Sequence, residues 1–230
     1  MPRKWLIIGI ALIVAIGAVL GGTALYAKLA NDSAPDKLTL STPTSGTATS
    51  GKVTPGTAGA GILAGAWTVS HGSQAGYRVK EVLNGQNVTV VGRTQGVTGN
   101  VVIDGTSLAA ASISVSMTSV ATDNSSRDSQ FLGILKTSQF PTSTFTLTRA
   151  VDIGAVKDGV APVQAVGELA VAGVKKSVTV SMKAQKTASG VEVSGSLPVT
   201  FSDYGIAAPN LGFVKVEDTG TIEMLLKLSR

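Results

Sequence analysis

Hydrophobic and polar residues alternate along most of the chain after Trp67. Val178, Val180 and Met182, for example, are separated by small polar residues, a period of two that is typical of a half-buried β-strand. The pattern predicts strands over Trp67–His71, Gly76–Leu83, Val88–Arg93, Gly99–Asp104, Ala111–Val120, Thr144–Ile153, Val163–Ala172, Ser177–Lys186, Val191–Phe201 and Gly220–Leu228. Because each strand must hide one face from water, the sequence predicts an all-β fold, either a barrel or a sandwich.

The alternation is interrupted once, by a polar turn at Thr122–Asn124 and a predicted helix over Ser125–Lys136. Phe131, Leu132 and Leu135 give this helix an apolar face. That face can pack on the core of the domain, or it can close one end of a barrel over a pocket.

The predicted inner faces of the strands are light. They use Val, Ala, Gly and Ser more than large residues, and aromatic residues make up only 4% of the chain. A barrel of about eight strands can hold one small ligand, so these faces fit a cavity, but they fit a thin, filled sandwich core equally well. Pro198 predicts an edge or a bulge in its strand, since proline cannot donate to a sheet.

An apolar segment precedes the domain. Trp5–Ala27 is a run of 23 residues without a charge, preceded by Arg3 and Lys4. The run is long enough for a membrane-spanning helix, and the basic residues before it favour a cytoplasmic N-terminus. The alternative is a signal peptide, but the run is longer than the usual apolar core and no clear cleavage site follows.

The segment between this run and the domain is rich in Ser, Thr, Gly, Ala and Pro. We predict a membrane anchor over residues 1–27, a flexible linker over 28–64 and a β-domain over 65–230. Such a linker buries too little apolar surface to offset the entropy of ordering it. The alternative within it is an additional stretch of strand around Leu38–Leu40.

Composition excludes several kinds of chemistry. The chain has no cysteine and a single histidine, His71, so a zinc site with several protein ligands is not expected. No serine lies in a nucleophile elbow. From Ala64 onward there are 14 Lys and Arg against 12 Asp and Glu, a net charge of +2, which gives no support for nucleic-acid binding. We therefore expect no enzyme, no metal and no cofactor.

Arg127 and Asp128 are the most distinctive polar pair, at the start of the predicted helix. Arg127 can meet a lipid head group at a cavity mouth, or it can pair with a nearby carboxylate. Asp128 can cap the helix N-terminus.

Several motifs in order along the chain resemble the YceI-like family. They are Trp67-Thr68-Val69 with Ser73 and Tyr77-Arg78-Val79, the Thr122–Leu132 segment, Phe140-Pro141 with Phe145, Gly167–Val178, Phe201–Ile206 and Val216-Glu217-Asp218. The match covers about residues 66–228. Two departures from the family pattern concern head-group specificity more than the fold. The Lys136–Pro141 segment is shorter than in the family, and His71 is offset from the position where the family often has a polar residue before its serine.

The resemblance implies an eight-stranded antiparallel, lipocalin-like barrel with a short helix and an elongated cavity for a polyisoprenoid or isoprenoid-quinone chain. The pocket residues then expected are Tyr77, Ile113, Val115, Met117, Phe131, Leu135, Phe140, Phe145, Val180, Met182 and Phe201, and the head-group candidates are His71, Arg127 and Asp128.

The function expected on this basis is a carrier for an isoprenoid lipid. It would be tethered to the cell membrane by a single span, with the barrel outside the cytoplasm, or secreted if the first segment is cleaved. The alternative is a structural or protein-interaction module of the cell envelope with a filled β-sandwich core.

Overall fold

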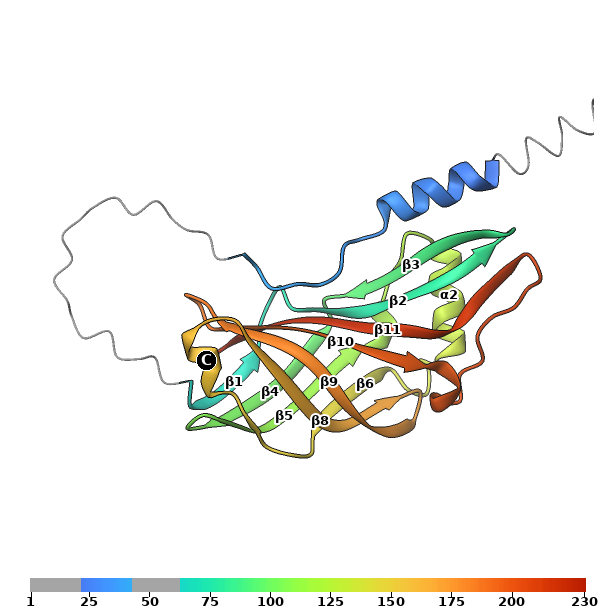
Figure 1. Cartoon of the computed structure of the whole chain (residues 1–230). Helices are drawn as coiled ribbons and strands as arrows, with labels where there is room; N and C mark the ends of the chain where they lie inside the picture. Colours follow the sequence, from blue (N-terminus) through green and yellow to red (C-terminus); the bar gives the residue numbers. More distant parts are fainter. Residues whose placement is uncertain (1–21, 43–62) are drawn as a thin grey trace, which may run out of the picture.

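The computed structural model describes residues 22–42 and 63–230. The predicted anchor, Trp5–Ala27, lies outside the described residues except for its last six positions, and so does the middle of the predicted linker, 43–62. The described part consists of a helix, an extended segment that follows the helix along the chain, and a β-barrel (Figure 1).

The secondary structure of the barrel is almost entirely strand. The elements are β1 (Gly65–Val69), β2 (Gln74–Leu83), β3 (Gln86–Thr94), β4 (Val97–Asp104), β5 (Ser107–Ser116), η1 (Met117–Ser119), α2 (Ser125–Ile134), β6 (Thr142–Leu147), β7 (Val151–Asp152), η2 (Gly154–Asp158), β8 (Ala161–Val171), β9 (Val174–Lys186), β10 (Val191–Thr200), η3 (Phe201–Tyr204) and β11 (Val214–Ser229).

The sheet closes on itself. Its order is β1-β4-β5-β6-β8-β9-β10-β11-β2-β3, and β1 also pairs with β11. β1 and β2 both pair with β11 on one side; on the other side, β1 pairs with β4 and β2 pairs with β3. β1 and β2 therefore act as one interrupted strand, and β3 and β4 act as another. Counted in this way, the described residues form an eight-stranded antiparallel barrel. Closure removes most of the exposed sheet edges.

The predicted strands are confirmed, and the differences have local causes. The strand expected to reach Val120 ends at Ser116, where η1 begins, and the strand expected over Thr144–Ile153 is divided into β6 and β7. Pro198 pairs with Thr221 of β11, beyond the last β9 partner at Ser196. The proline therefore lies where β10 has a partner on one side only, in agreement with its missing N–H donor.

A helix over residues 22–33 contains the last residues of the charge-free run and lies beside the barrel (Figure 1). Its Ala27 is buried. At its end, Asn31 uses both atoms of its amide on β3: Nδ2 donates to the Asn87 carbonyl (2.9 Å), and Oδ1 accepts from the Thr89 amide (2.8 Å). Within the described ranges, no helix is both long and apolar enough to cross a membrane.

Residues 35–41, which we name the strap, cross the outer face of the barrel. Arg78 Nη2 of β2 donates to the Pro35 carbonyl (2.6 Å), and the hydroxyl of Ser194 in β10 donates to the Leu38 carbonyl (2.6 Å). The strap has no regular strand structure. This part of the predicted linker is thus held against the barrel, unlike the free tether expected there, whereas the domain division itself stays a prediction.

The end of the strap is held by a buried carboxylate. Oε2 of Glu192 accepts from the Ser41 backbone amide (2.7 Å), the Ser41 hydroxyl (2.7 Å) and Gln185 Nε2 (3.0 Å). Burial raises the pKa of Glu192, but these hydrogen bonds outweigh it and hold the pKa below its ordinary value of 4.5. A lowered folded-state pKa means that the contact contributes stability above pH 4.5 and loses it as the pH falls through the lowered value.

We expect Glu192→Ala to free the strap and leave the barrel folded. The substitution removes the acceptor of the Ser41 amide, and a hydrogen bond to a charged group contributes about 1.5–3 kcal/mol. Hydrogen exchange should therefore speed up at residues 38–42 but not in β9 or β10. Glu168→Ala, which removes an exposed partner of Lys175, is the control, and unchanged protection of Ser41 in Glu192→Ala would contradict the assignment.

Candidate binding cavity

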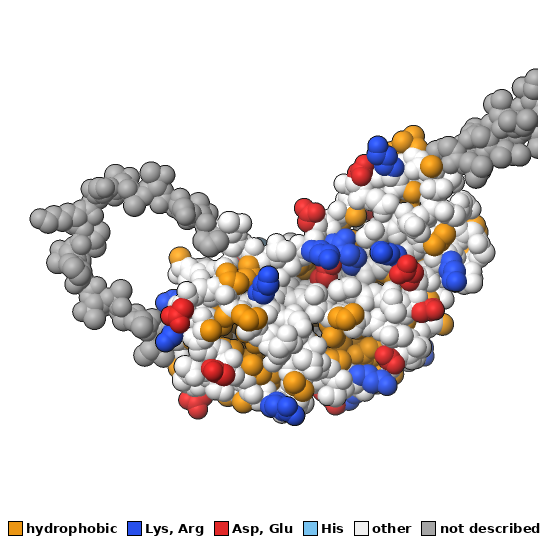
Figure 2. Space-filling view, viewed as in Figure 1, with side chains coloured by type: hydrophobic (Ala, Val, Ile, Leu, Met, Phe, Trp, Pro, Cys, Tyr) orange, Lys and Arg blue, Asp and Glu red, His pale blue; other side chains and the backbone are white. Residues whose placement is uncertain are grey.

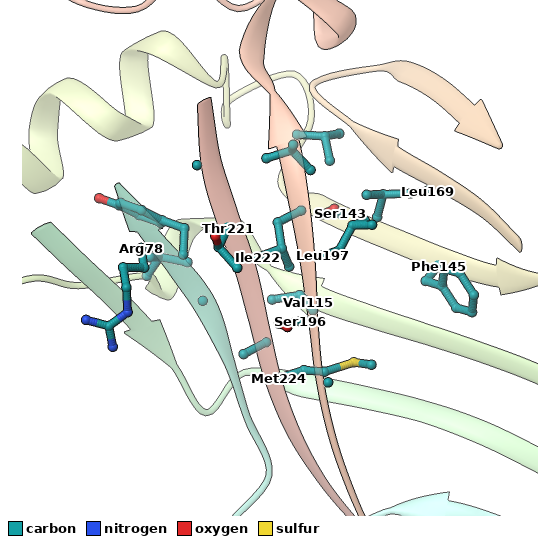
Figure 3. A pocket seen from close by; sticks show the side chains of 18 of the residues that line it. Arg78, Val115, Ser143, Phe145, Leu169, Ser196, Leu197, Thr221, Ile222 and Met224 are labelled. Carbon is teal, nitrogen blue, oxygen red and sulfur yellow. The ribbon is translucent and has the colours of Figure 1, made fainter. Parts of the chain in front are cut away.

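The barrel encloses a cavity of about 540 Å³. Its walls are the inward-facing positions of the strands, because successive side chains on a strand point to opposite faces. Figure 3 shows several of them, including Val115 of β5, Leu197 of β10, and Ile222 and Met224 of β11. The volume lies within the range of small-molecule sites. The filled sandwich that the light inner faces also allowed is therefore wrong.

Glycines on neighbouring strands make room for two aromatic side chains of the wall. A Cβ atom at Gly92 would collide with the ring of Tyr77, its partner across β2 and β3. A Cβ atom at Gly167 of β8 would collide with the ring of Phe145 on β6. In both places the glycine leaves room for the ring of a residue that lines the cavity.

One end of the cavity is closed. Val156 of η2 is 1% exposed and packs with Leu63, Trp67 and Ile153. The indole N–H of Trp67 donates to the Leu63 carbonyl (2.7 Å). This packing holds the chain that enters β1 across the base of the barrel.

The other end of the cavity reaches the surface, and we name it the mouth. Its lining residues include several that are exposed: Tyr26 of the N-terminal helix, Asn124, Ser126 and Gln130 around α2, and Leu211 and Phe213 in the loop before β11. The mouth is therefore bounded by α2, by the N-terminal helix and by the loop over 205–213.

An ion-pair cluster lies at the mouth. Arg127 Nη2 of α2 contacts Oε1 of Glu81 on β2 (3.0 Å), and its Nη1 contacts Oδ1 of Asp123 (2.7 Å). Glu81 is only 7% exposed and points inward. Burial alone would lower the pKa of Arg127, but Glu81 and Asp123 outweigh it and raise the pKa. Tyr26 also hydrogen-bonds to Arg127.

Two aromatic rings connect α2 to the wall beside this cluster. The rings of Tyr77 and Phe131 stack with centroids 5.0 Å apart and an interplanar angle of 11°. Burial raises the pKa of Tyr77 from 10.0 to about 12, against the opposing effect of Arg127. The phenol therefore stays protonated further into alkali than an ordinary tyrosine and keeps a hydrogen-bond donor beside the mouth.

The N-terminal cap of α2 is Asn124, so the prediction that Asp128 caps this helix is wrong. The Asn124 side chain accepts from the Ser126 and Arg127 amides (2.9 and 3.3 Å). Asp128 lies one turn further on and reaches back to Thr122, accepting from its amide (2.8 Å) and its hydroxyl (2.7 Å). Asn124 has the extended backbone conformation of an N-cap residue, and asparagine is one of the residue types favoured at that position.

The structure gathers most of the predicted pocket residues around the cavity. Those that line it are Tyr77, Ile113, Val115, Met117, Phe131, Leu135, Phe145, Val180, Met182 and Phe201, together with the head-group candidate Arg127. Phe140 instead packs over the Gly173 turn between β8 and β9. His71 is exposed in the turn between β1 and β2, and neither it nor Asp128 is among the lining residues.

Sequence reasoning missed Glu81, Tyr26, Leu211 and Phe213. The signal for Glu81 was present, because it has the same parity as Val79 and Tyr77 and so belongs to the inner face of its strand. Nothing in the local sequence placed Tyr26 at the mouth, since its partner Arg127 lies a hundred residues further along the chain.

A family model described as the YceI-like domain matches residues 67–228. The chain therefore belongs to the YceI-like family, and the resemblance found in the sequence is confirmed. A search of curated proteins finds no match to it.

Two solved structures share the fold. A polyisoprenoid-binding domain from Saccharophagus degradans, implicated in plant cell wall breakdown, is 17% identical with a TM-score of 0.58, covering 71% of this chain and 97% of that one. BcnA from Burkholderia cenocepacia is 19% identical with a TM-score of 0.53, covering 67% of this chain and 96% of the other. At these identities the likeness establishes the barrel fold.

The Arg127–Glu81 pair should contribute to stability. Arg127→Met leaves the Glu81 carboxylate without its partner, and an unpaired buried polar group costs about 1–3 kcal/mol, with more for a charged one. Chemical denaturation should show that loss for Arg127→Met, and a smaller loss for Arg127→Met with Glu81→Leu. Lys175→Met, which removes an exposed pair, should change stability by less than about 1 kcal/mol. Additive effects in the double variant would argue against coupling.

Tyr77 should make the protein less stable in alkali. Because its folded-state pKa is raised, the unfolded chain loses this proton first, and stability falls as the pH rises from 10 toward 12. The difference in unfolding free energy between wild type and Tyr77→Phe should therefore change across this range. Tyr204→Phe replaces another buried tyrosine with a raised pKa, and its unfolding free energy is compared over the same pH range. A difference in unfolding free energy between wild type and Tyr77→Phe that stays constant with pH would refute the shift.

Proposed function

We propose that this protein binds the apolar chain of an isoprenoid lipid, a polyisoprenoid or an isoprenoid quinone, inside the barrel. The observation that carries this proposal is an apolar cavity, closed at one end, with the Arg127–Glu81 ion pair at its mouth. Such a cavity suits a long apolar chain with a single polar end. Family membership and the polyisoprenoid-binding domain of similar fold support the same class of ligand.

The physical basis of binding is burial of hydrocarbon. Each buried CH₂ group contributes about 0.8 kcal/mol, from which the cost of immobilising the ligand is subtracted. Affinity should therefore rise with chain length until the chain fills the cavity. At the mouth, the Arg127 guanidinium and the Tyr77 hydroxyl are the donors available to a phosphate or a quinone carbonyl.

The proposal includes a location. We infer that Trp5–Ala27 remains attached as a membrane anchor and that the barrel lies outside the cytoplasm. The length of the charge-free run and the basic residues before it support this placement. Sequencing of the mature N-terminus tests it: a start at Met1 or Pro2 agrees with the anchor, and a start near Lys28 would mean cleavage and secretion.

Val115→Trp tests the cavity as the binding site. Val115 lines the cavity from β5, and an indole there occupies the space of the ligand. We expect binding of a polyprenyl phosphate and of an isoprenoid quinone, measured on the purified full chain, to fall by more than tenfold with the melting temperature nearly unchanged. A straight-chain fatty acid serves as the ligand control for isoprenoid preference.

Ser112→Trp is the matched control variant, because Ser112 is exposed on the outer face of the same strand. It should bind both lipids as the wild type does. If Val115→Trp instead loses about 1–3 kcal/mol of stability, as overpacking of a filled core does, and binds lipid unchanged, the cavity is not the site.

A further inference from the structure

Exposed hydrophobic side chains are concentrated on two segments that border the mouth. Of the seven large hydrophobic residues exposed in the described part of the chain, five lie on the N-terminal helix or on the 205–213 loop. They are Leu25, Tyr26, Leu29, Leu211 and Phe213, and their exposed fractions range from 42% to 59%. We name these five residues the rim. Figure 2 shows hydrophobic side chains exposed on the helix at the upper right of the molecule.

The two halves of the rim frame the same opening. Tyr26, Leu211 and Phe213 all line the cavity. The loop is held against the β2–β3 turn, where the Asn84 amide donates to the Phe213 carbonyl (2.8 Å). Residues 205–213 contain no charged residue, so no ionised side chain of this loop has to leave water when the loop enters an apolar phase.

The helix that carries the other half is fixed to the barrel. Tyr26 bonds to Arg127, Ala27 is buried, and Asn31 occupies the edge of β3. The strap continues this attachment as far as Ser41. The charge-free run Trp5–Ala27 ends in this helix. The chain is therefore held at the mouth where the run ends.

This attachment leaves almost no free chain between the run and the barrel. A free linker of 37 residues, 28–64, would let the mouth point in any direction. From Ala27 to Asn31 the helix advances only about 6 Å, at 1.5 Å per residue. With the run in a bilayer, the mouth must lie at the surface of that bilayer.

We propose that the rim inserts into the surface of the lipid bilayer, so that a lipid passes between membrane and cavity without crossing water. This inference rests on the proposed function and names the surface from which the ligand comes. Leu, Tyr and Phe side chains suit the boundary between head groups and acyl chains, where interfacial segments are buried by about 5–10 Å. Tyr26, Leu211 and Phe213 of the rim then continue the apolar wall of the cavity.

Nitroxide accessibility tests the proposal on the full chain. Because the chain has no cysteine, a spin label on Leu211→Cys reports on one site. Val160→Cys is the control, since Val160 has the same exposed fraction of 55% and follows η2 at the closed end. Each labelled chain is reconstituted into vesicles of phosphatidylethanolamine and phosphatidylglycerol and exposed to oxygen, which partitions into lipid, or to a water-soluble nickel chelate.

We expect the label at Leu211 to be more accessible to oxygen, relative to the chelate, than the label at Val160 in the same vesicles. Phe213→Cys repeats the measurement if the first variant does not fold. An equal preference for oxygen at the two ends, or a Leu211 label that favours the chelate, overturns the proposal. So does protection from both reagents, which would assign the rim to a protein partner or a second copy. The measurement does not require an isoprenoid ligand, so a chain that binds lipid in solution but fails here loses only this inference.

Discussion

The structure depends on the closure of one sheet through the double pairing of β1, with β4 on one side and β11 on the other. Closure satisfies the edge groups of the strands, and it also fixes the radius of the barrel. Val, Ala and Gly at the inward positions are too small to fill that radius. The cavity of about 540 Å³ is therefore a consequence of light residues on a closed sheet, as much as of any individual side chain.

The two ion-pair clusters are placed where they do not interrupt the apolar wall. Arg127, Glu81 and Asp123 gather at the mouth, between α2 and β2. A second cluster, in which Glu223 pairs with Arg78 and Arg93, lies on the outer face beneath the strap. The first cluster gives the cavity a polar entrance, and the second fastens the preceding chain. Together they connect the predicted membrane segment to the opening of the barrel.

The sequence predicted the local parts of this arrangement well. Alternation located the strands, and Asn84-Gly85 and Ala172-Gly173 marked two-residue turns whose residues all have positive φ. The interruption at 122–141 located α2. The alternation by itself could not decide between a barrel and a sandwich, because closure depends on pairing between β1 and β11, which lie at opposite ends of the domain. The strap was missed for the same reason, since Ser41 and Glu192 are 151 residues apart.

The central claim is that the cavity holds an isoprenoid chain, and native mass spectrometry of the full chain extracted from its own membranes tests it most directly. The account predicts a population that retains one lipid after the detergent is stripped in the gas phase, with a fragment mass that matches a polyisoprenoid or an isoprenoid quinone. A chain that carries only phospholipids in proportion to their abundance in the membrane, or none at all, would contradict it.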